Sequence, residues 1–410
     1  MKKFRKSETD FTRNRKLPFH FLILFLLNII RSSMQNELDN FFKLILNSDI
    51  AVRYITKSAF TKARKKLKYQ AFIELGKKMI FYFYQNYRTK TWNGFHLIAV
   101  DGSKIFLPKN EEITQHFGDI IYKYGESVII ANASQIFDCL NEITIDAIIS
   151  PGKVGERELL EMQIHCLNKD DLLLMDRGYP AFWLFALLIK KGVNFCARIG
   201  MNSWKIVREF SNSNEFERII TVNPSFKSKQ HCKNQGISVE ALTLRLVKIE
   251  LSSGHTEILV TTLIDDKIYD HNIFEDLYHL RWPVEEDYKI MKLRIEIENF
   301  SGKSVESIYQ DFHAKVFTKN LTTILKTGMQ DQVNEKCKKR KYQYKINSTN
   351  ALCKMKNNIV LLFTKKNYLN ILSQLLKLLA SEIEAVRKNR KCVRRKNPPK
   401  RFFPQYKPIT

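Results

Sequence analysis

Four polar residues occur at helical spacing near position 285: Tyr278, Arg281, Glu285 and Lys292. Their separations of three, four and seven positions place them within an arc of about 60° on one helix face, because an α-helix turns 100° per residue. A carboxylate beside two cations and a phenol suits a site in which the carboxylate holds a metal ion while the other groups bind a phosphate. The same charges also fit a solvated helix with an i,i+4 pair between Glu285 and Lys289.

Two further acids follow predicted strands. The apolar run at residues 95–100 leads into Asp101 of the segment D-G-S, and the run at residues 172–175 leads into Asp176 of the segment D-R-G-Y. A buried strand that ends on an aspartate and turns at a glycine places the carboxylate at the edge of a sheet, where metals and substrates bind. Either aspartate alone could cap a turn, but two such strands together predict an acidic site.

A tertiary fold must bring Glu285 to these aspartates, because it lies 184 positions after Asp101. Pro283 cannot donate a helical hydrogen bond, so we expect the helix to kink there or to restart with Pro283 in its first turn. Acids that hold the same ions must lie within several ångströms of each other. Without metal we expect a raised pKa for at least one acid, or a compensating Arg or Lys nearby.

The order and spacing of these motifs resemble a known family. The pattern Y-x2-R-x3-E-x6-K at residues 278–292 resembles the signature of the insertion-sequence-4-like branch of DDE transposases. The segments D-G-S and D-R-G-Y resemble that family's first and second catalytic motifs. The resemblance implies a ribonuclease-H-like core whose metal-binding acids are Asp101, Asp176 and Glu285.

The resemblance also implies cofactors and partners. Two divalent ions, Mg²⁺ or Mn²⁺, would bind to the three acids, since hard carboxylate oxygens suit Mg²⁺. Phosphates near the transposon end would contact Tyr278, Arg281 and Lys292. The expected partner is double-stranded DNA, namely the terminal inverted repeats and the target, with a homodimer holding the paired ends.

The pattern of predicted helices and strands indicates a mixed α/β (α+β) chain in five parts. These are an N-terminal helical DNA-binding domain (1–90), the first part of the ribonuclease-H-like core (91–200), a β-rich insertion (201–268), the second part of the core (269–330), and a basic C-terminal region with its tail (331–410). The insertion accounts for the 109 positions between Asp176 and Glu285, and the family has one at this place. Within the core we expect a helix over 180–191 closed by Gly192, a strand over 194–199 and a long helix over 304–327.

The charge distribution indicates a polyanionic partner. The net charge is +26, and residues 336–410 contribute a surplus of 19, from 21 Lys and Arg against two Glu. The run of cations and prolines from residue 387 onward predicts an extended basic tail. A predicted helix over 56–67 has a basic face that is a candidate for lying on DNA, although a solvated face explains it as well: Lys57, Lys62, Arg64, Lys65 and Lys66.

Cysteines and apolar runs bear on location. The seven cysteines are scattered, without a C-x2-C pair, which favours free thiols in a reducing cytoplasm over disulfides or a zinc site. We therefore expect a cytoplasmic protein, and the resemblance implies a bacterial protein associated with the nucleoid. The most apolar run, residues 19–30, is too short to span a membrane, and we predict a buried helix that starts at Pro18.

These observations favour a DNA transposase that binds terminal inverted repeats and catalyses metal-dependent cleavage and strand transfer, in cut-and-paste transposition. One alternative is a transposase-derived repressor that binds DNA without catalysis, and the intact acids count against it. Another alternative is a Mg²⁺-dependent nuclease without strand transfer, which shares the same core.

Overall fold

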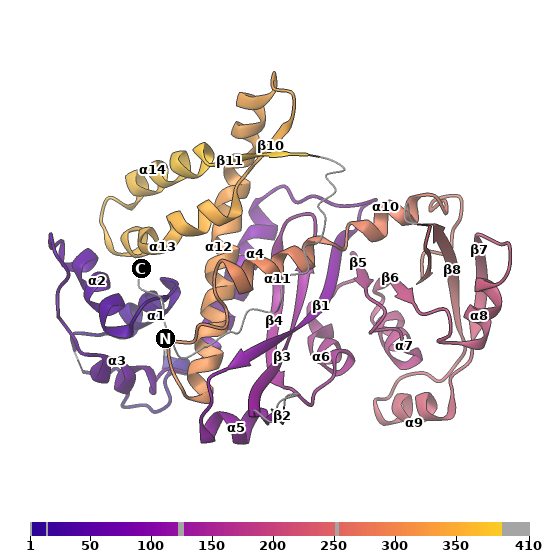
Figure 1. The fold of residues 1–410 in the computed structure, drawn as a ribbon, viewed down its shortest axis with the longest axis horizontal. Helices are drawn as coiled ribbons and strands as arrows, with labels where there is room; N and C mark the ends of the chain where they lie inside the picture. The colour runs from indigo at the N-terminus through magenta and orange to yellow at the C-terminus, as the bar shows by residue number, and fades with distance from the viewer. Residues whose placement is uncertain (1, 14, 122–126, 251–253, 388–410) are drawn as a thin grey trace. The chain divides into compact units, whose positions relative to one another are not determined.

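The computed structural model describes residues 2–13, 15–121, 127–250 and 254–387 (Figure 1). The chain divides into two compact units. The first comprises Met1–Tyr87, Ile105–Ala131 and Lys289–Thr410, and the second comprises Arg88–Lys104 and Asn132–Tyr288. The basic tail predicted from residue 387 onward lies, beyond that residue, outside the described residues.

Most strands of one large sheet belong to the second unit, while β2, the end of β1 and the start of β3 belong to the first. The strands follow one another in the order β2, β3, β1, β5, β6, β9, β8 and β7, and β4 also pairs with β3. Their bounds are β1 His96–Leu107, β2 Ile120–Ile121, β3 Ser127–Asp138, β4 Ile143–Pro151, β5 Asp171–Met175, β6 Asn194–Ile199, β7 Glu217–Val222, β8 Leu242–Glu250 and β9 Thr256–Thr261. All five residues of β5 are buried, as expected for a central strand whose two faces are both covered.

The strand directions match the predicted ribonuclease-H-like core. Strands β1, β5 and β6 are parallel. The amide of Cys139, just after β3, donates to the carbonyl of Leu97 at the start of β1 at 2.8 Å, so these two strands are antiparallel. The short connection from Asp138 to Ile143 makes β3 and β4 an antiparallel hairpin. Three antiparallel strands followed by two parallel ones confirm the mixed α/β prediction.

Helices cover both faces of this sheet in the second unit. One face packs against α6 (Glu156–Gln163), the short helix η2 (Ile164–Cys166) and α7 (Phe182–Lys191), which ends at Gly192 in the left-handed conformation. The other face packs against α10 (Ile273–His279) and the start of α11 (Pro283–Leu293). Alternate residues of each strand enter the two cores, because successive side chains point to opposite faces.

The predicted insertion extends the core sheet rather than forming a separate layer. Strand β9 pairs with β6, with Cys196 opposite Thr261, and β8 and β7 follow. Two helices, α8 (Lys205–Ser211) and α9 (Phe226–Asn234), lie between the strands in sequence. The β-rich prediction for 201–268 missed both of these short helices.

The first unit is mainly helical. Its helices include η1 (Lys2–Phe4), α1 (Phe19–Leu27), α2 (Met34–Leu46), α3 (Lys57–Arg64), α4 (Gln70–Asn86), α5 (Glu111–Phe117), α12 (Val305–Cys337), α13 (Ser348–Thr364) and α14 (Tyr368–Ser381). A hairpin of β10 (Gln343–Ile346) and β11 (Ile383–Val386) completes it. Helix α14 ends at Ser381, and residues 383–386 pair as a strand directly after it.

A shared core joins the N-terminal and C-terminal segments of the first unit. Phe25 of α1, Phe41 of α2, Met355 of α13 and Leu375 of α14 belong to one buried cluster, and α12 contacts α1, α4, α13 and α14. Residues 1–87 and the described residues 331–387, from the two ends of the chain, therefore belong to one unit.

Two further expectations concern apolar helices and thiols. No helix of the described ranges combines the length and hydropathy that crossing a lipid bilayer requires. The predicted buried helix near residue 18 is confirmed as α1, which follows Pro18. The six cysteines within the described part of the chain are free thiols, as predicted.

Candidate active site

Asp101 and Asp176 occupy matching positions on neighbouring parallel strands. The register pairs Ala99 of β1 with Leu174 of β5, so the next residues on the same face are the two aspartates. Because adjacent strands lie about 4.8 Å apart, the backbones of the two aspartates lie side by side in the sheet. The prediction that the two strands are neighbours is confirmed. The prediction that Asp101 ends its strand is wrong, because β1 continues to Leu107.

The polar row continues across β6 and β9. The pairing of Met175 with Ala197 brings Arg198 beside Asp176. Nη2 and Nε of Arg198 donate to Oδ1 of Asp176 at 2.6 and 3.1 Å, and its Nη1 donates to Glu257 on β9. The sequence interpretation missed Arg198, although its position in the predicted strand over 194–199 put it on a defined face.

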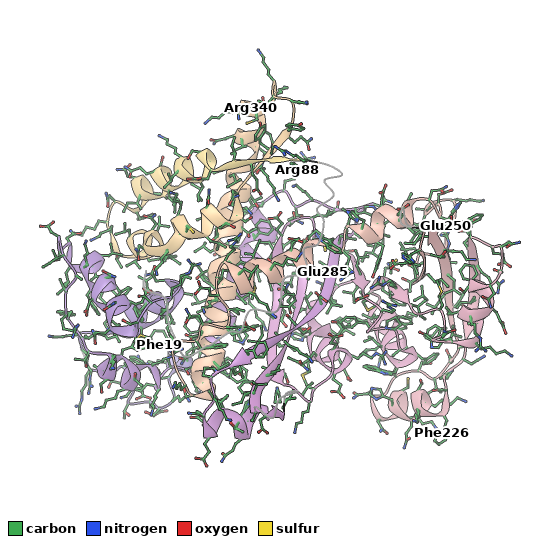
Figure 2. The ribbon with its side chains drawn as sticks, in the orientation of Figure 1. Phe19, Arg88, Phe226, Glu250, Glu285 and Arg340 are labelled. Atoms are coloured by element: carbon green, nitrogen blue, oxygen red, sulfur yellow. The ribbon has the colours of Figure 1, made fainter. Side chains whose placement is uncertain are left out.

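The helical segment above this row carries the third predicted acid. α10 ends at His279 and α11 begins at Pro283, so the restart predicted at Pro283 is confirmed. Glu285 lies in the first turn of α11 (Figure 2). Nη2 of Arg281 donates to Oε1 of Glu285, and this i,i+4 ion pair joins two of the four residues whose spacing predicted a common face.

Tyr278 lies between two guanidinium groups. Arg281 and Arg198 stand 5.7 and 6.0 Å from the centre of its ring, a distance at which cations are attracted to an aromatic face. The Tyr278 hydroxyl donates to the carbonyl of Met175, the residue before Asp176, at 3.4 Å. Burial raises the pKa of Tyr278, so its hydroxyl stays a neutral donor.

Asp101 carries the electrostatic signature predicted for a crowded acidic site. Burial raises its pKa to about 6, and the charges of Glu285 and Asp176 act in the same direction. The guanidinium of Arg281 and the Gly102 amide oppose this rise. Asp176 and Glu285 therefore lie close enough to influence the ionisation of Asp101, and the raised pKa expected for at least one of the acids is confirmed.

Asp176 behaves in the opposite way. Burial acts to raise its pKa, but the Arg177 amide, the hydrogen bonds from Arg198 and the charge of Arg281 outweigh burial and lower it. Asp176 is therefore ionised at neutral pH. The compensating cations expected near the acids are confirmed as Arg198 and Arg281.

The donor chemistry suits a hard cation, whereas the carboxylates do not converge in this conformation. Within residues 2–13, 15–121, 127–250 and 254–387, no three His, Cys, Asp or Glu side chains are placed to hold one ion. Arg198 and Arg281 instead hold Asp176 and Glu285. Asp101, Asp176 and Glu285 would supply the carboxylate oxygen ligands that Mg²⁺ and Mn²⁺ favour. The residues therefore fit such ions, provided that Asp176 and Glu285 are released from their ion pairs with the arginines.

Two buried polar atoms of this region have no partner among the described residues. They are Nη1 of Arg281 and the hydroxyl of Tyr179. A buried donor without a partner costs about 1–3 kcal/mol, which makes both atoms candidates for contacts with a ligand. Lys292 lies on the part of α11 that belongs to the first unit, and its phosphate contact stays a prediction.

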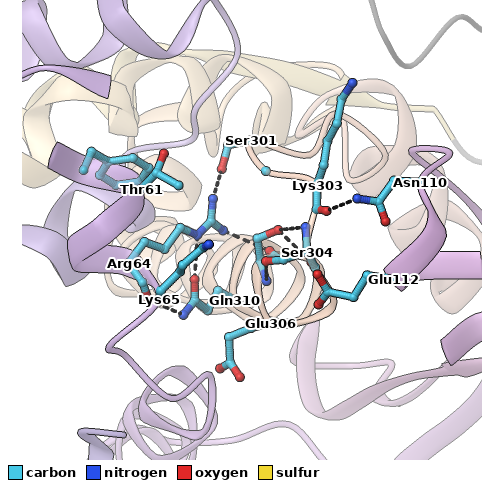
Figure 3. A pocket seen from close by; sticks show the side chains of 13 residues that line it. Thr61, Arg64, Lys65, Asn110, Glu112, Ser301, Lys303, Ser304, Glu306 and Gln310 are labelled. Carbon is cyan, nitrogen blue, oxygen red and sulfur yellow. Dashed lines mark hydrogen bonds between the residues drawn. The ribbon is translucent and has the colours of Figure 1, made fainter. Parts of the chain in front are cut away.

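The predicted basic face of α3 is smaller than the sequence indicated. Arg64 is 4% exposed and forms an ion pair with Asp311 at 2.6 Å. Its Nε donates to Gln310 and its Nη1 to Ser301, both at 2.6 Å, beside a cavity of about 360 Å³ (Figure 3). Arg64 is thus a structural cation of the first unit, and its assignment to DNA binding is corrected.

The other predicted cations of α3 differ from Arg64. Lys66 forms an ion pair with Asp10 at 3.0 Å. Lys57, Lys62 and Lys65 are exposed, and none has an acidic partner among the described residues. These three lysines remain available on the surface of the first unit.

Comparisons with known proteins identify the family of this chain. Residues 92–321 match the model of the transposase DDE domain, which is more than half of the chain, so the chain belongs to the DDE transposase domain family. No curated protein matches it. Among solved structures it is similar to one described as the cryo-EM structure of a piggyBac transposase synaptic complex with hairpin DNA. The identity is 11% and the TM-score 0.44, over 88% of this chain and 71% of that one.

Proposed function

We propose that this transposase belongs to the insertion-sequence-4-like branch and acts on the terminal inverted repeats of an insertion sequence. It cleaves the element's ends and joins them to a target, in cut-and-paste transposition. The observation that carries the proposal is the in-register placement of Asp101 and Asp176 beneath the helical segment that bears Glu285.

The three acids are the proposed metal ligands of the active site. Asp101, Asp176 and Glu285 would hold two Mg²⁺ or Mn²⁺ ions, which activate the attacking oxygen and stabilise the leaving oxygen of a phosphodiester. Before metal binds, Arg198 and Arg281 neutralise two of the carboxylates. These arginines hold the two carboxylates in place, and each acid could exchange its guanidinium partner for a metal cation.

Arg281, Tyr278 and Lys292 are the proposed phosphate contacts. Nη1 of Arg281 is buried and has no partner within the described ranges, while Nη2 holds Glu285. A phosphate oxygen would satisfy this donor through a charge-assisted hydrogen bond. The same guanidinium would then position both the third acid and the DNA backbone.

The proposed partners are double-stranded DNA and a second copy of the chain. The net charge of +26 and the exposed lysines of α3 favour contact with phosphates. A homodimer would hold the two paired ends, and the protein would act at the nucleoid in the bacterial cytoplasm.

The test uses the full-length protein and a plasmid that carries the element's own ends. With Mg²⁺ we expect cleavage at the ends, and with precleaved 3′-OH ends and a target plasmid we expect joined products. Cleavage without joining would identify a metal-dependent nuclease. Specific binding without either reaction would identify a transposase-derived repressor.

A further inference from the structure

Two glycines near the aspartates have backbone conformations that other residues could also adopt. Gly102 follows Asp101, Gly178 lies two positions after Asp176, and neither has a positive φ. A Cβ at Gly102 would lie 2.7 Å from Oε1 of Glu156, and a Cβ at Gly178 would lie 2.9 Å from Oε2. Real Cβ atoms essentially never approach other atoms so closely, so both glycines make room for one carboxylate.

Glu156 is the first residue of α6. The next residue, Arg157, links this end of the helix to the D-R-G-Y segment by a hydrogen bond. Nε of Arg157 donates to the carbonyl of Gly178 at 2.8 Å. Within the described residues, the Glu156 carboxylate accepts no hydrogen bond of its own. It is thus a charged group held between the D-G-S and D-R-G-Y segments without a hydrogen-bonding partner.

An independent feature points to the same place. Tyr179 is 1% exposed, and its hydroxyl has no partner in the described part of the chain. Burial and then the charges of Glu156, Asp101 and Asp176 raise its pKa. A buried hydroxyl that has no partner and lies in the electrostatic field of three carboxylates marks a polar site that protein groups alone do not complete.

We propose that Glu156 is a fourth acid of the active site, a positioning residue that spans the two aspartate segments and strengthens their affinity for divalent cations. The inference rests on the proposed metal-binding function of Asp101 and Asp176. The Glu156 carboxylate adds negative charge beside the glycines of the two aspartate segments, and a divalent cation bound to those segments would be attracted to that charge. The same contact with Gly102 and Gly178 limits how far the two segments approach each other.

Mn²⁺ binding to the full-length protein, measured by calorimetry, tests the charge of Glu156. We expect Glu156→Gln to weaken Mn²⁺ binding about tenfold, the size expected for the loss of one exposed charge near a divalent ion. Glu161→Gln is the matched control, because it makes the same change on α6 about 140° around the helix from Glu156. Unchanged Mn²⁺ affinity for Glu156→Gln would overturn the inference.

Substitution of the glycines tests the positioning role separately. Gly102→Ala and Gly178→Ala should displace the Glu156 carboxylate, the far end of a flexible side chain, with little effect on thermal stability but with weaker Mn²⁺ binding. In a Glu156→Ala background the added methyl group meets no carboxylate, so either alanine should cause no further loss of affinity. Additive losses in the double variants would overturn the positioning role.

Asp101→Asn separates the failure of this inference from that of the proposed function. If Asp101→Asn weakens Mn²⁺ binding and Glu156→Gln does not, only the role of Glu156 fails. If Asp101→Asn also binds Mn²⁺ as the wild type does, the proposed metal site itself is wrong.

Discussion

Replacement of Arg64 by methionine should destabilise the first unit without a direct effect on DNA contacts. Arg64 and Asp311 have side chains that are only 5% and 4% exposed, so their ion pair is buried. Loss of one partner from a buried pair costs about 3–5 kcal/mol, because the remaining charge is left without compensation. An exposed pair contributes only about 0–1 kcal/mol, which gives the experiment a clear contrast.

The structure places the expected loss near the lower end of that range. Asp311 still accepts from the Ser301 amide at 2.6 Å and from the Ser301 hydroxyl at 2.8 Å, so its charge keeps two donors. Gln310 and the carbonyl of Ser307 each lose one guanidinium donor. We therefore expect a loss of about 3 kcal/mol in the free energy of unfolding of the first unit.

Urea unfolding followed by circular dichroism measures this loss, with Lys65→Met as the control. Lys65 is exposed at the end of the same helix, so its replacement should change stability by less than about 0.5 kcal/mol while weakening DNA binding. Adding Asp311→Asn to Arg64→Met should recover part of the loss, since it removes the uncompensated charge. A change below about 1 kcal/mol for Arg64→Met, or strictly additive losses in the double variant, would refute the buried-pair reasoning.

Three further predictions concern the active site and the tail. Asp101→Asn, Asp176→Asn and Glu285→Gln should each reduce plasmid cleavage by orders of magnitude while DNA binding in gel-shift assays persists, because two-metal chemistry fails with an incomplete ligand set, and Glu286→Gln should be milder. An essential Glu286 with a dispensable Glu285 would contradict the assignment of the third acid. Deletion of residues 387–410 should weaken binding to all DNA sequences alike and flatten the salt dependence by about 0.9 for each phosphate that the tail no longer neutralises, and an unchanged slope would assign the tail another role. In a chelator, Asp101→Asn should stabilise the second unit on the order of 2 kcal/mol at pH 7. Because its pKa is raised from 3.8 to about 6, stability from its protonated form is lost as pH rises through about 6, so the gain in melting temperature should disappear near pH 4.

The acids could be proposed from the sequence because short sequence patterns point to them. The ion-pair partner of Asp176 could not, because it lies on another strand. Asp101 and Asp176 each follow an apolar run, a pattern that can be recognised from the sequence alone. Helical spacing likewise relates Arg281 to Glu285. Arg198 is assigned to Asp176 only by the register of β5 and β6, which a single sequence does not specify. Arg64 shows the converse error, since its place on a short basic helix predicts an exposed cation while its guanidinium pairs with an acid 247 positions away.

The two ends of the chain share one core for a related physical reason. The charge and the pattern of predicted helices and strands change along the chain at about residues 90 and 331, and those changes predict separate domains. Burial follows complementary apolar faces instead, so Phe25 and Leu375 share one core although 350 positions separate them. The strands of the insertion likewise join the main sheet. Without them β6 would be an edge strand with unpaired backbone groups, and β9 pairs with those groups.

The pairing of the acids with arginines gives the metal-free site a defined state. Asp176 and Glu285 are each held by a guanidinium, whereas Asp101 has no such hydrogen-bonded cation among the described residues and shows the raised pKa. Asp101 would therefore be the acid most accessible to a divalent cation, since no arginine is paired with it. Asp176 and Glu285 would serve as ligands only when they are released from Arg198 and Arg281, and a phosphate bound to these guanidinium groups would balance their charge. Metal binding and DNA binding should consequently reinforce each other, because each supplies the charge that the other leaves unbalanced.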